Sequence, residues 1–469
     1  MSEITPAKDT NLDANEKSLD QYASVNEVDG IVKPDQIPQD DGEVFKVGPG
    51  QAEFRTLGWI KAAIILMKLC FATGVLAIPS SLVVVGYVPG VILLVVWGVL
   101  FTYYAYVMYQ FRMKIPGIHS IADAAHVMGG SIARDVTGGL FLLTWVLATG
   151  SGLVGLATGL DVLADGKVCL VVWTFVAAAC TALCASIPTL GKLTLLTWVG
   201  FSCSFVAVFV VVVGVTQVDR PAVAPKEGPY DLMFIAVGHP GFVAGLTASI
   251  NLFAGYGSTP TFMPVIAEMA RPKDFRKSLL TSQIFLMMCY VSFGMVMYAY
   301  CGQYVASPSL GSAGGTIEKI AYGIAILGLI MTTTLWVHVA AKYVLVRVLR
   351  NSRHLQSKTP IHWAVWLGAT IGITTTSFVI AEAIPFFSYL VGLIGALCCA
   401  PTCLVIPAMM GIYMDKGKHS TTWWRKCLFA FHCLIMVVGS FITVAGTYTC
   451  IQSIVDAYAE GTVGHAFSC

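Results

Sequence analysis

Two apolar stretches of the chain hold the residues whose types and spacing suggest chemistry. Each has Phe-Ala close before a glycine that is followed five residues later by a proline, in the runs Phe71–Pro79 and Phe253–Pro260. These residues favour an interrupted helix, because glycine adopts unusual dihedral angles and proline lacks an N–H donor. Freed N–H groups at the start of a half-helix bind an anion, and freed carbonyls at the end of the preceding one accept from an ammonium. The runs therefore predict a site for a ligand that carries both an amine and a carboxylate.

Other signatures of chemistry are lacking. The sequence has no phosphate-binding G-x-x-x-x-G-K-[ST] loop, and the glycine-rich segment Gly311–Gly315 has no strand–helix context. The fourteen cysteines lie mostly inside apolar blocks and show no paired metal-ligand spacing. We therefore expect no enzymatic activity, no catalytic residue, no metal, no cofactor and no nucleic-acid partner.

The elements that position these residues are membrane-spanning helices. Of the 469 residues 56% are hydrophobic and only 12% charged, whereas soluble domains carry about 25% charged residues. The apolar residues form successive blocks of about 20, the length that crosses a lipid bilayer. Eleven spans are expected, near residues 58–80, 86–110, 138–162, 167–187, 193–216, 240–267, 278–302, 316–348, 362–382, 385–412 and 424–452.

Basic residues orient these spans in the bilayer. Lys and Arg concentrate in cytoplasmic loops, and if the N-terminus is cytoplasmic, the outer connections hold only Lys167, Arg220, Lys226 and Lys319. The inner connections then hold a much larger set: Arg112, Lys114, Arg134, Lys192, Arg271, Lys273, Arg276, Lys277, Arg347, Arg350, Arg353, Lys358, Lys416, Lys418, Arg425 and Lys426. This predicts a cytoplasmic N-terminus and, with eleven spans, a C-terminus on the opposite face.

The chain divides into three parts. Residues 1–55 are expected to form a disordered acidic cytoplasmic tail, because the first fifty residues hold eleven acids and few large apolar side chains. Residues 56–452 form the transmembrane domain, and 453–469 form a short extracytoplasmic C-terminal tail. The two glycine–proline runs then fall in the first and sixth spans, which enter from opposite sides. Breaks at matching places in two oppositely oriented halves are typical of inverted repeats with a binding site at the membrane midplane. Close-packing glycines and kinking prolines are the alternative reading.

These runs also carry a family resemblance. Lys68–Ser80, Phe253–Gly257 with the later Ile266–Met269, and Ile384-Pro385 followed by Val391–Ala396 resemble the amino acid/auxin permease family, in particular its fungal neutral amino acid permeases, over about residues 55–452. The resemblance implies the fold of the amino acid–polyamine–organocation superfamily, an all-α membrane protein with a 5+5 inverted repeat, broken first and sixth helices and here one extra helix. It also implies secondary active transport of amino acids, usually driven by protons.

The resemblance places site residues on four spans. The break in span one would lie beside the carboxylate of the substrate, and the break in span six would surround the amine and the side chain of the substrate. Spans three and eight would close the pocket. The residues carried over are Ala72, Thr73, Gly74 and Val75 in span one, Phe253, Ala254, Gly255 and Tyr256 in span six, Thr149 and Ser151 in span three, and Thr333 in span eight.

These residues lack an acid that could pair a cationic substrate, so we expect neutral aliphatic and aromatic amino acids to be carried. An amino-acid sensor on the same fold and a vacuolar amino acid exporter are the alternatives. The membrane is expected to be the plasma membrane, with the vacuolar membrane as the other possibility.

Lys68 is the expected coupling residue. It lies seven residues after Lys61, about 10 Å further along a helix, and a charge at that depth costs about 2.5–3.5 kcal/mol on insertion scales. It must be paired or able to lose its proton. Either its protonation helps to set the conformational equilibrium, or it is a static partner of carbonyl or hydroxyl groups. Glu268 is expected to make an ion pair or gate contact beside Arg271 and Lys273, and Lys342 to extend toward the interface.

Overall fold

The computed structural model describes residues 57–187, 190–350, 352–355, 359–384, 387–417, 422–460 and 467, and these are almost entirely helical. The predicted acidic tail, residues 1–55, lies outside this part of the chain. Within it, the one β-type pairing is an isolated bridge between Leu57 and Met269, which ties the start of the first helix to the end of the sixth span.

The helices follow the predicted spans in order. They are α2 (Trp59–Val85), α3 (Tyr87–Lys114), α4 (Ile121–Leu163), α5 (Leu170–Ala185), α6 (Leu190–Gly214), α7 (Phe242–Ala254), α8 (Phe262–Glu268), α9 (Phe275–Cys301), α10 (Gly315–Leu349), α11 (Pro360–Ala383), α12 (Phe387–Leu393), the π-helix η6 (Ile394–Val405), α13 (Ile406–Met414), α14 (Trp423–Phe441), the π-helix η7 (Ile442–Gly446) and α15 (Thr447–Ala459).

Most of these elements are long enough to cross a bilayer. Eight spans of the described chain pass on length and composition, or nine when the bent α2 is counted as one. The two other predicted spans correspond to the 16-residue α5 and to the pair α7 and α8. All eleven predicted segments are therefore helical, and the predicted all-α membrane fold is confirmed.

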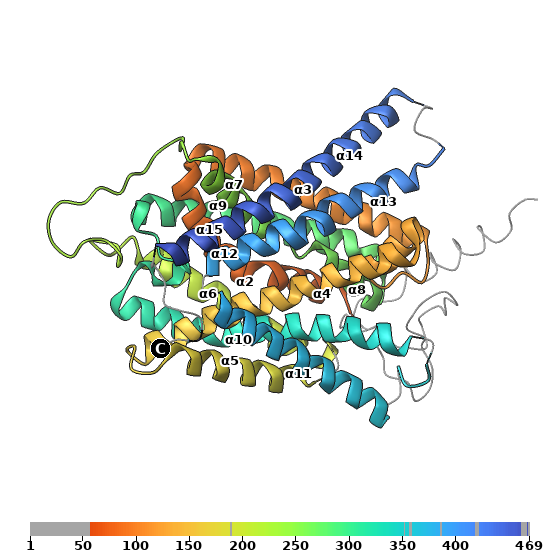
Figure 1. The fold of residues 1–469 in the computed structure, drawn as a ribbon, viewed down its shortest axis with the longest axis horizontal. Helices are drawn as coiled ribbons and strands as arrows, with labels where there is room; N and C mark the ends of the chain where they lie inside the picture. Colours follow the sequence, from red (N-terminus) through yellow and green to blue (C-terminus); the bar gives the residue numbers. More distant parts are fainter. Residues whose placement is uncertain are drawn as a thin grey trace, which may run out of the picture.

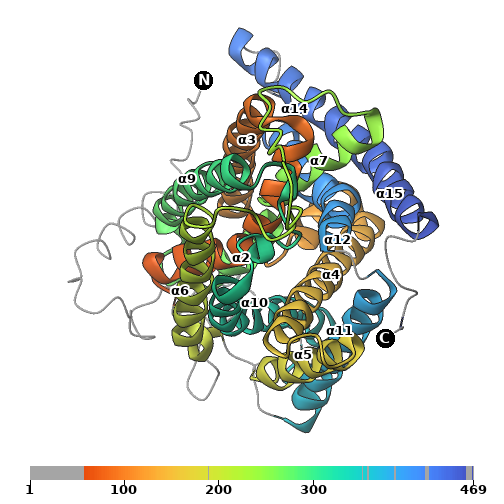
Figure 2. The ribbon, with the colours of Figure 1, turned by 90° about the vertical axis from the view of Figure 1, so that its left-hand side faces the viewer.

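The helices form one bundle, with most of the long axes running in a similar direction (Figure 1). Seen end-on, α2 lies inside the bundle, α5 and α11 lie at one rim, and α14 and α15 lie at the opposite rim (Figure 2). Helix α2 packs on α9, α7 and α6, while α10 packs on α6 and α4. Residues of spans one and six thus meet in the middle of the molecule.

Both predicted helix breaks are present. The two parts of α2, Trp59–Phe71 and Gly74–Val85, are bent by 44° relative to each other. The sixth span ends its first half, α7, at Ala254 and begins its second half, α8, only at Phe262. We call the bend in α2 the first break and residues 255–261 the second break.

Two boundaries differ from the sequence-based expectation. Helix α4 begins at Ile121, not near 138, because Ser120 and Asp123 form a reciprocal capping box there. A kink at Gly129 and Gly130, where Gly130 has φ 73°, then turns the helix into the span. At the other end of the chain, α15 continues to Ala459, beyond the predicted end of the last span at residue 452.

Candidate ligand site at the two helix breaks

The two breaks lie against each other at Gly74 and Gly255. A Cβ atom added to Gly74 would lie 2.9 Å from the Cα of Gly255 and 2.8 Å from the hydroxyl oxygen of Tyr290 on α9. Real Cβ atoms do not approach backbone atoms so closely, so only glycine allows this contact. The two breaks are therefore closed on each other in this structure.

The carbonyl groups next to the first break have partners on other helices. Ser258 Oγ donates to the carbonyl of Leu69 at 2.8 Å, and Tyr290 Oη lies 2.9 Å from the carbonyl oxygen of Cys70. Both carbonyls belong to the turn just before the bend. The first break is thus joined to the second break and to α9 by side chains from 189 and 220 residues away.

The second break satisfies its backbone in the same way. The carbonyl of Gly255 accepts from the same Tyr290 hydroxyl, at 2.9 Å. The carbonyl of Gly257 lies 3.5 Å from the thiol of Cys399 and 3.4 Å from that of Cys403, both on η6. Irregular backbone at membrane depth requires such partners, because no water is present to replace them.

Aromatic rings surround the second break. The ring of Phe253 packs edge-on against Trp97 and Phe101 of α3, each at 5.1 Å between centroids. The ring of Tyr256 lies 5.1 Å from that of Tyr290, and its buried hydroxyl has no hydrogen-bond partner among the described residues. All five side chains are uncharged, so this wall offers apolar surface and one unused hydroxyl group.

The predicted residues on spans three and eight have diverse surroundings. Thr149 is buried, and its hydroxyl has no hydrogen-bond partner in the part of the chain that the structure describes. Ser151 donates to the carbonyl of Ala148 in its own helix. Thr333 shares a 2.9 Å hydrogen bond with Thr181 of α5, so its hydroxyl lies on the α5 side of α10.

In the first break, Val75 is buried, whereas the side chains of Ala72 and Thr73 are outside the described residues. Of the predicted set, the structure brings Gly74 and Gly255 into contact. Sequence reasoning missed Tyr290, Ser258 and the thiols of η6, which no local motif marks.

Lys68 is fully buried one turn before the first break. Its ammonium lies 2.9 Å from the carbonyl of Gly200, 2.8 Å from Ser204 Oγ and 2.8 Å from the carbonyl of Gly328. Gly200 and Ser204 belong to α6, and Gly328 belongs to α10. One side chain of α2 therefore connects three helices, a contact that is compatible with both roles considered for Lys68.

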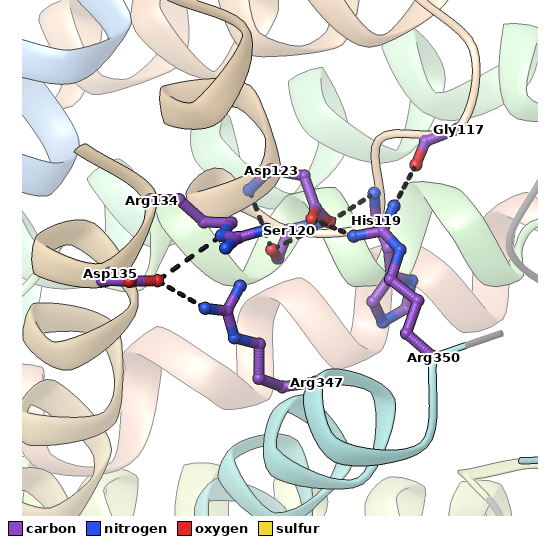
Figure 3. Close-up of polar contacts among 8 residues, drawn as sticks. All are labelled: Gly117, His119, Ser120, Asp123, Arg134, Asp135, Arg347 and Arg350. Atoms are coloured by element: carbon purple, nitrogen blue, oxygen red, sulfur yellow. Dashed lines mark hydrogen bonds and ion pairs between the residues drawn. The ribbon is translucent and has the colours of Figure 1, made fainter. Parts of the chain in front are cut away.

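A group of ion pairs surrounds the C-terminal half of α10, and we call it the α10 cluster. Its pairs are Glu268–Lys342, Asp123–Arg350 and Asp135–Arg347, with Arg134 also beside Asp135. Figure 3 shows the two pairs near the end of α10, where its arginines reach the aspartates of α4. Of these pairs in the described chain, Glu268–Lys342 is the buried one, with each side chain 5% exposed.

This pair agrees with the ion pair expected of Glu268 and corrects the expectation for Lys342. Lys342 does not extend toward the interface, because its ammonium pairs with Glu268 at the end of α8. Next to this pair, His119 lies in the connection between α3 and α4. Burial, together with the charge of Lys342, holds the pKa of His119 well below its usual range.

Comparison with known proteins agrees with this architecture. A family model described as transmembrane amino acid transporter protein matches residues 55–452. A protein of Gibberella moniliformis named transmembrane transporter is 38% identical over 96% of this chain and 97% of its own length. The N amino acid transport system protein of Neurospora crassa is 30% identical, over 90% of each chain.

Solved structures show the same fold at low sequence identity. The transporter Mhp1 of the nucleobase–cation–symport-1 family, in a closed conformation with bromovinylhydantoin bound, matches with a TM-score of 0.52 and 14% identity over 88% of this chain and 95% of its own. The inward-facing conformation of Mhp1 matches with a TM-score of 0.55 and 12% identity, over 91% and 96% of the two chains. These matches confirm the fold of two inverted repeats.

Proposed function

Because this chain belongs to the family of transmembrane amino acid transporters, we propose that it carries neutral aliphatic and aromatic amino acids across the membrane together with protons. The observation that supports this most directly is the meeting of the two breaks. Carbonyls of Cys70 and Gly255, from opposite halves of the fold, lie within 2.9 Å of one donor oxygen. Two converging carbonyls are the acceptors that a substrate ammonium requires.

The surroundings of the breaks support a neutral substrate. A cationic side chain would need a carboxylate nearby, because an unpaired charge in this environment is costly. The side chains around the second break are aromatic rings, a hydroxyl group and thiols. The buried acid Glu268 is already paired with Lys342. Leucine and phenylalanine therefore suit this wall better than arginine or glutamate.

Lys68 supports coupling to protons. A protonated amine has three N–H donors, and Lys68 has three acceptors within 2.9 Å. A neutral amine has only two N–H donors and no charge, so its hydrogen bonds to α6 and α10 would be fewer or weaker. Loss of the proton would thus weaken the attachment of α2 to α6 or α10. A fixed positive charge here would also repel sodium.

The test is uptake of a labelled amino-acid panel by cells that express the protein. Neutral amino acids should compete for one saturable site, and uptake should persist when choline replaces sodium but stop with a protonophore. Lys68→Ala should remove the dependence of uptake on pH, while the control Lys61→Ala, two turns earlier on α2, should retain it. Sodium-dependent uptake that ignores the proton gradient would refute the coupling, and preference for arginine or glutamate would refute the substrate class.

We further propose that the N-terminus and the α10 cluster face the cytoplasm, at the plasma membrane, because the connections on that side hold most of the Lys and Arg residues. An epitope tag at the C-terminus should be accessible in intact cells, whereas a tag at the N-terminus should become accessible only after the cells are permeabilised. Exposure of both tags on one side would refute the eleven-span topology.

A further inference from the structure

The hydroxyl of Tyr290 lies at the point where the two breaks meet. It is 2.9 Å from the carbonyl oxygen of Cys70 and 2.9 Å from that of Gly255, and the side chain is fully buried. A hydroxyl group has one proton and donates one full hydrogen bond. Two carbonyls from two different spans are therefore served by one shared proton.

An ammonium group matches this arrangement better than a hydroxyl group does. It has three N–H donors and can serve both carbonyls at once, with a charge that strengthens each bond. We propose that the Tyr290 hydroxyl takes the place of the substrate ammonium when the transporter closes without substrate. This inference rests on the proposed amino acid transport and names the residue that allows the empty protein to complete the cycle.

The closed breaks show why such a residue is needed. Gly74 and Gly255 are in contact, so a substrate cannot lie between them until they separate. A symporter that accumulates its substrate must return empty, and during that step the carbonyl of Gly255, which lies outside any helix, still needs a donor. A buried carbonyl without a partner is destabilising. Tyr290 supplies the donor from α9, outside both breaks, and must move aside when the ammonium arrives.

The consequence is a difference between net uptake and exchange. Net uptake includes the return of the empty protein, whereas exchange of internal for external substrate does not. Tyr290→Phe removes the stand-in donor and should therefore slow net uptake much more than exchange. We expect the ratio of net uptake to exchange to fall about tenfold, which corresponds to about 1.4 kcal/mol.

The measurement uses the full chain in proteoliposomes with labelled leucine, inside vesicles that are either empty or loaded with unlabelled leucine. The matched control is Tyr298→Phe. Tyr298 is also buried on α9, but its hydroxyl bonds the carbonyl of Met233 and the N–H of Ile235, far from the breaks in the outer connection. The control should keep the ratio of the unchanged protein. An unchanged ratio in Tyr290→Phe, or an equal fall in both variants, would overturn the inference.

A measurement on the unchanged protein removes dependence on how well the variant folds. Leucine and its amino alcohol leucinol carry the ammonium, whereas the matching 2-hydroxy acid carries a single hydroxyl proton. Leucine and leucinol should raise the thermal stability of the purified protein, and the hydroxy acid should not. Equal stabilisation by the hydroxy acid would overturn the inference. Absence of any leucine flux in the unchanged protein would instead refute the proposed function.

Discussion

Replacing Gly74 tests whether the contact between the two breaks is part of the transport cycle. The variants are Gly74→Ala, which adds one methyl group, and Gly74→Val, which adds two more carbon atoms. The first added carbon would lie 2.9 Å from the Cα of Gly255, 3.0 Å from its carbonyl oxygen and 2.8 Å from Tyr290 Oη. Two of these three atoms belong to backbone and cannot rotate away, so the breaks must separate to accept the methyl group.

The size of the effect follows from the cost of overpacking. Forcing an extra carbon into a packed interior costs about 1–3 kcal/mol, which reduces the population of the closed state about 5–150-fold. We expect Gly74→Ala to lower the rate of uptake by at least about fivefold, and Gly74→Val to abolish it. Insertion into the membrane should be preserved, because both substitutions keep the span apolar and improve its helix propensity.

The assay is the initial rate of labelled leucine uptake, divided by the amount of protein at the membrane. The control is Gly372→Ala on α11, where an added Cβ would have no heavy atom within 4 Å. It should transport within about twofold of the unchanged protein, as expected for a substitution that contacts nothing. Normal uptake kinetics in Gly74→Ala would show that the closed contact is not visited during transport, and that the first break is not part of the site.

Two further predictions concern the α10 cluster. Lys342→Met alone leaves Glu268 buried without its partner and should lower the free energy of unfolding by about 3–5 kcal/mol. The double variant with Glu268→Gln should recover most of this loss. Equal stability of the single and double variants would contradict the prediction. The second prediction concerns the effect of pH on the α10 cluster. Burial in the closed cluster lowers the pKa of His119. If the cluster opens and exposes His119 to water, its pKa should return to about 6.5. Closure is therefore fully favoured above about pH 6.5 and weakens as the pH falls below it. Thiol labelling of a cysteine introduced in this connection should rise on acidification, and His119→Gln should abolish that rise.

Charged groups of both signs surround His119. Lys342 of α10 and the arginines Arg112 and Arg350 oppose its protonation, whereas Asp123 favours it. Because Asp123 is itself paired with Arg350, its charge is largely used by that pair. The net effect of the closed cluster is to keep His119 neutral, in agreement with the direction of the predicted pH dependence. A pH-independent labelling rate would show that His119 stays buried when this face opens.

Local sequence signals were sufficient for the spans and the breaks. Apolar blocks of span length mark the helices, and glycine with proline inside such a block marked the interruptions at Gly74 and Gly255. The start of α4 was placed too late, because its first turns carry Asp123, Arg134 and Asp135, and a polar, amphipathic helix segment has the composition of a connection.

Partners across the bundle could not be predicted, because they depend on how distant segments pack. Tyr290 lies 220 residues from Cys70, and nothing in its own span distinguishes it from other tyrosines. Lys342 was expected at the interface because it lies near a basic helix end, and its partner Glu268 is 74 residues away in the sequence. Lys68 was recognised because its depth alone requires a partner, although its sequence does not name that partner.

The internal bonds of the closed state indicate how the substrate can open the protein. The carbonyls of Leu69, Cys70 and Gly255 already accept from Ser258 or Tyr290, and the ammonium of Lys68 already has three acceptors. A substrate therefore gains only the difference between its own bonds and those that it replaces. The gain in free energy is small where one hydrogen-bond donor replaces another. It is larger where an ammonium donates to two carbonyls that previously shared one hydroxyl proton. We therefore propose that recognition of the substrate and release of the closed contact are the same event at the meeting point of the two breaks.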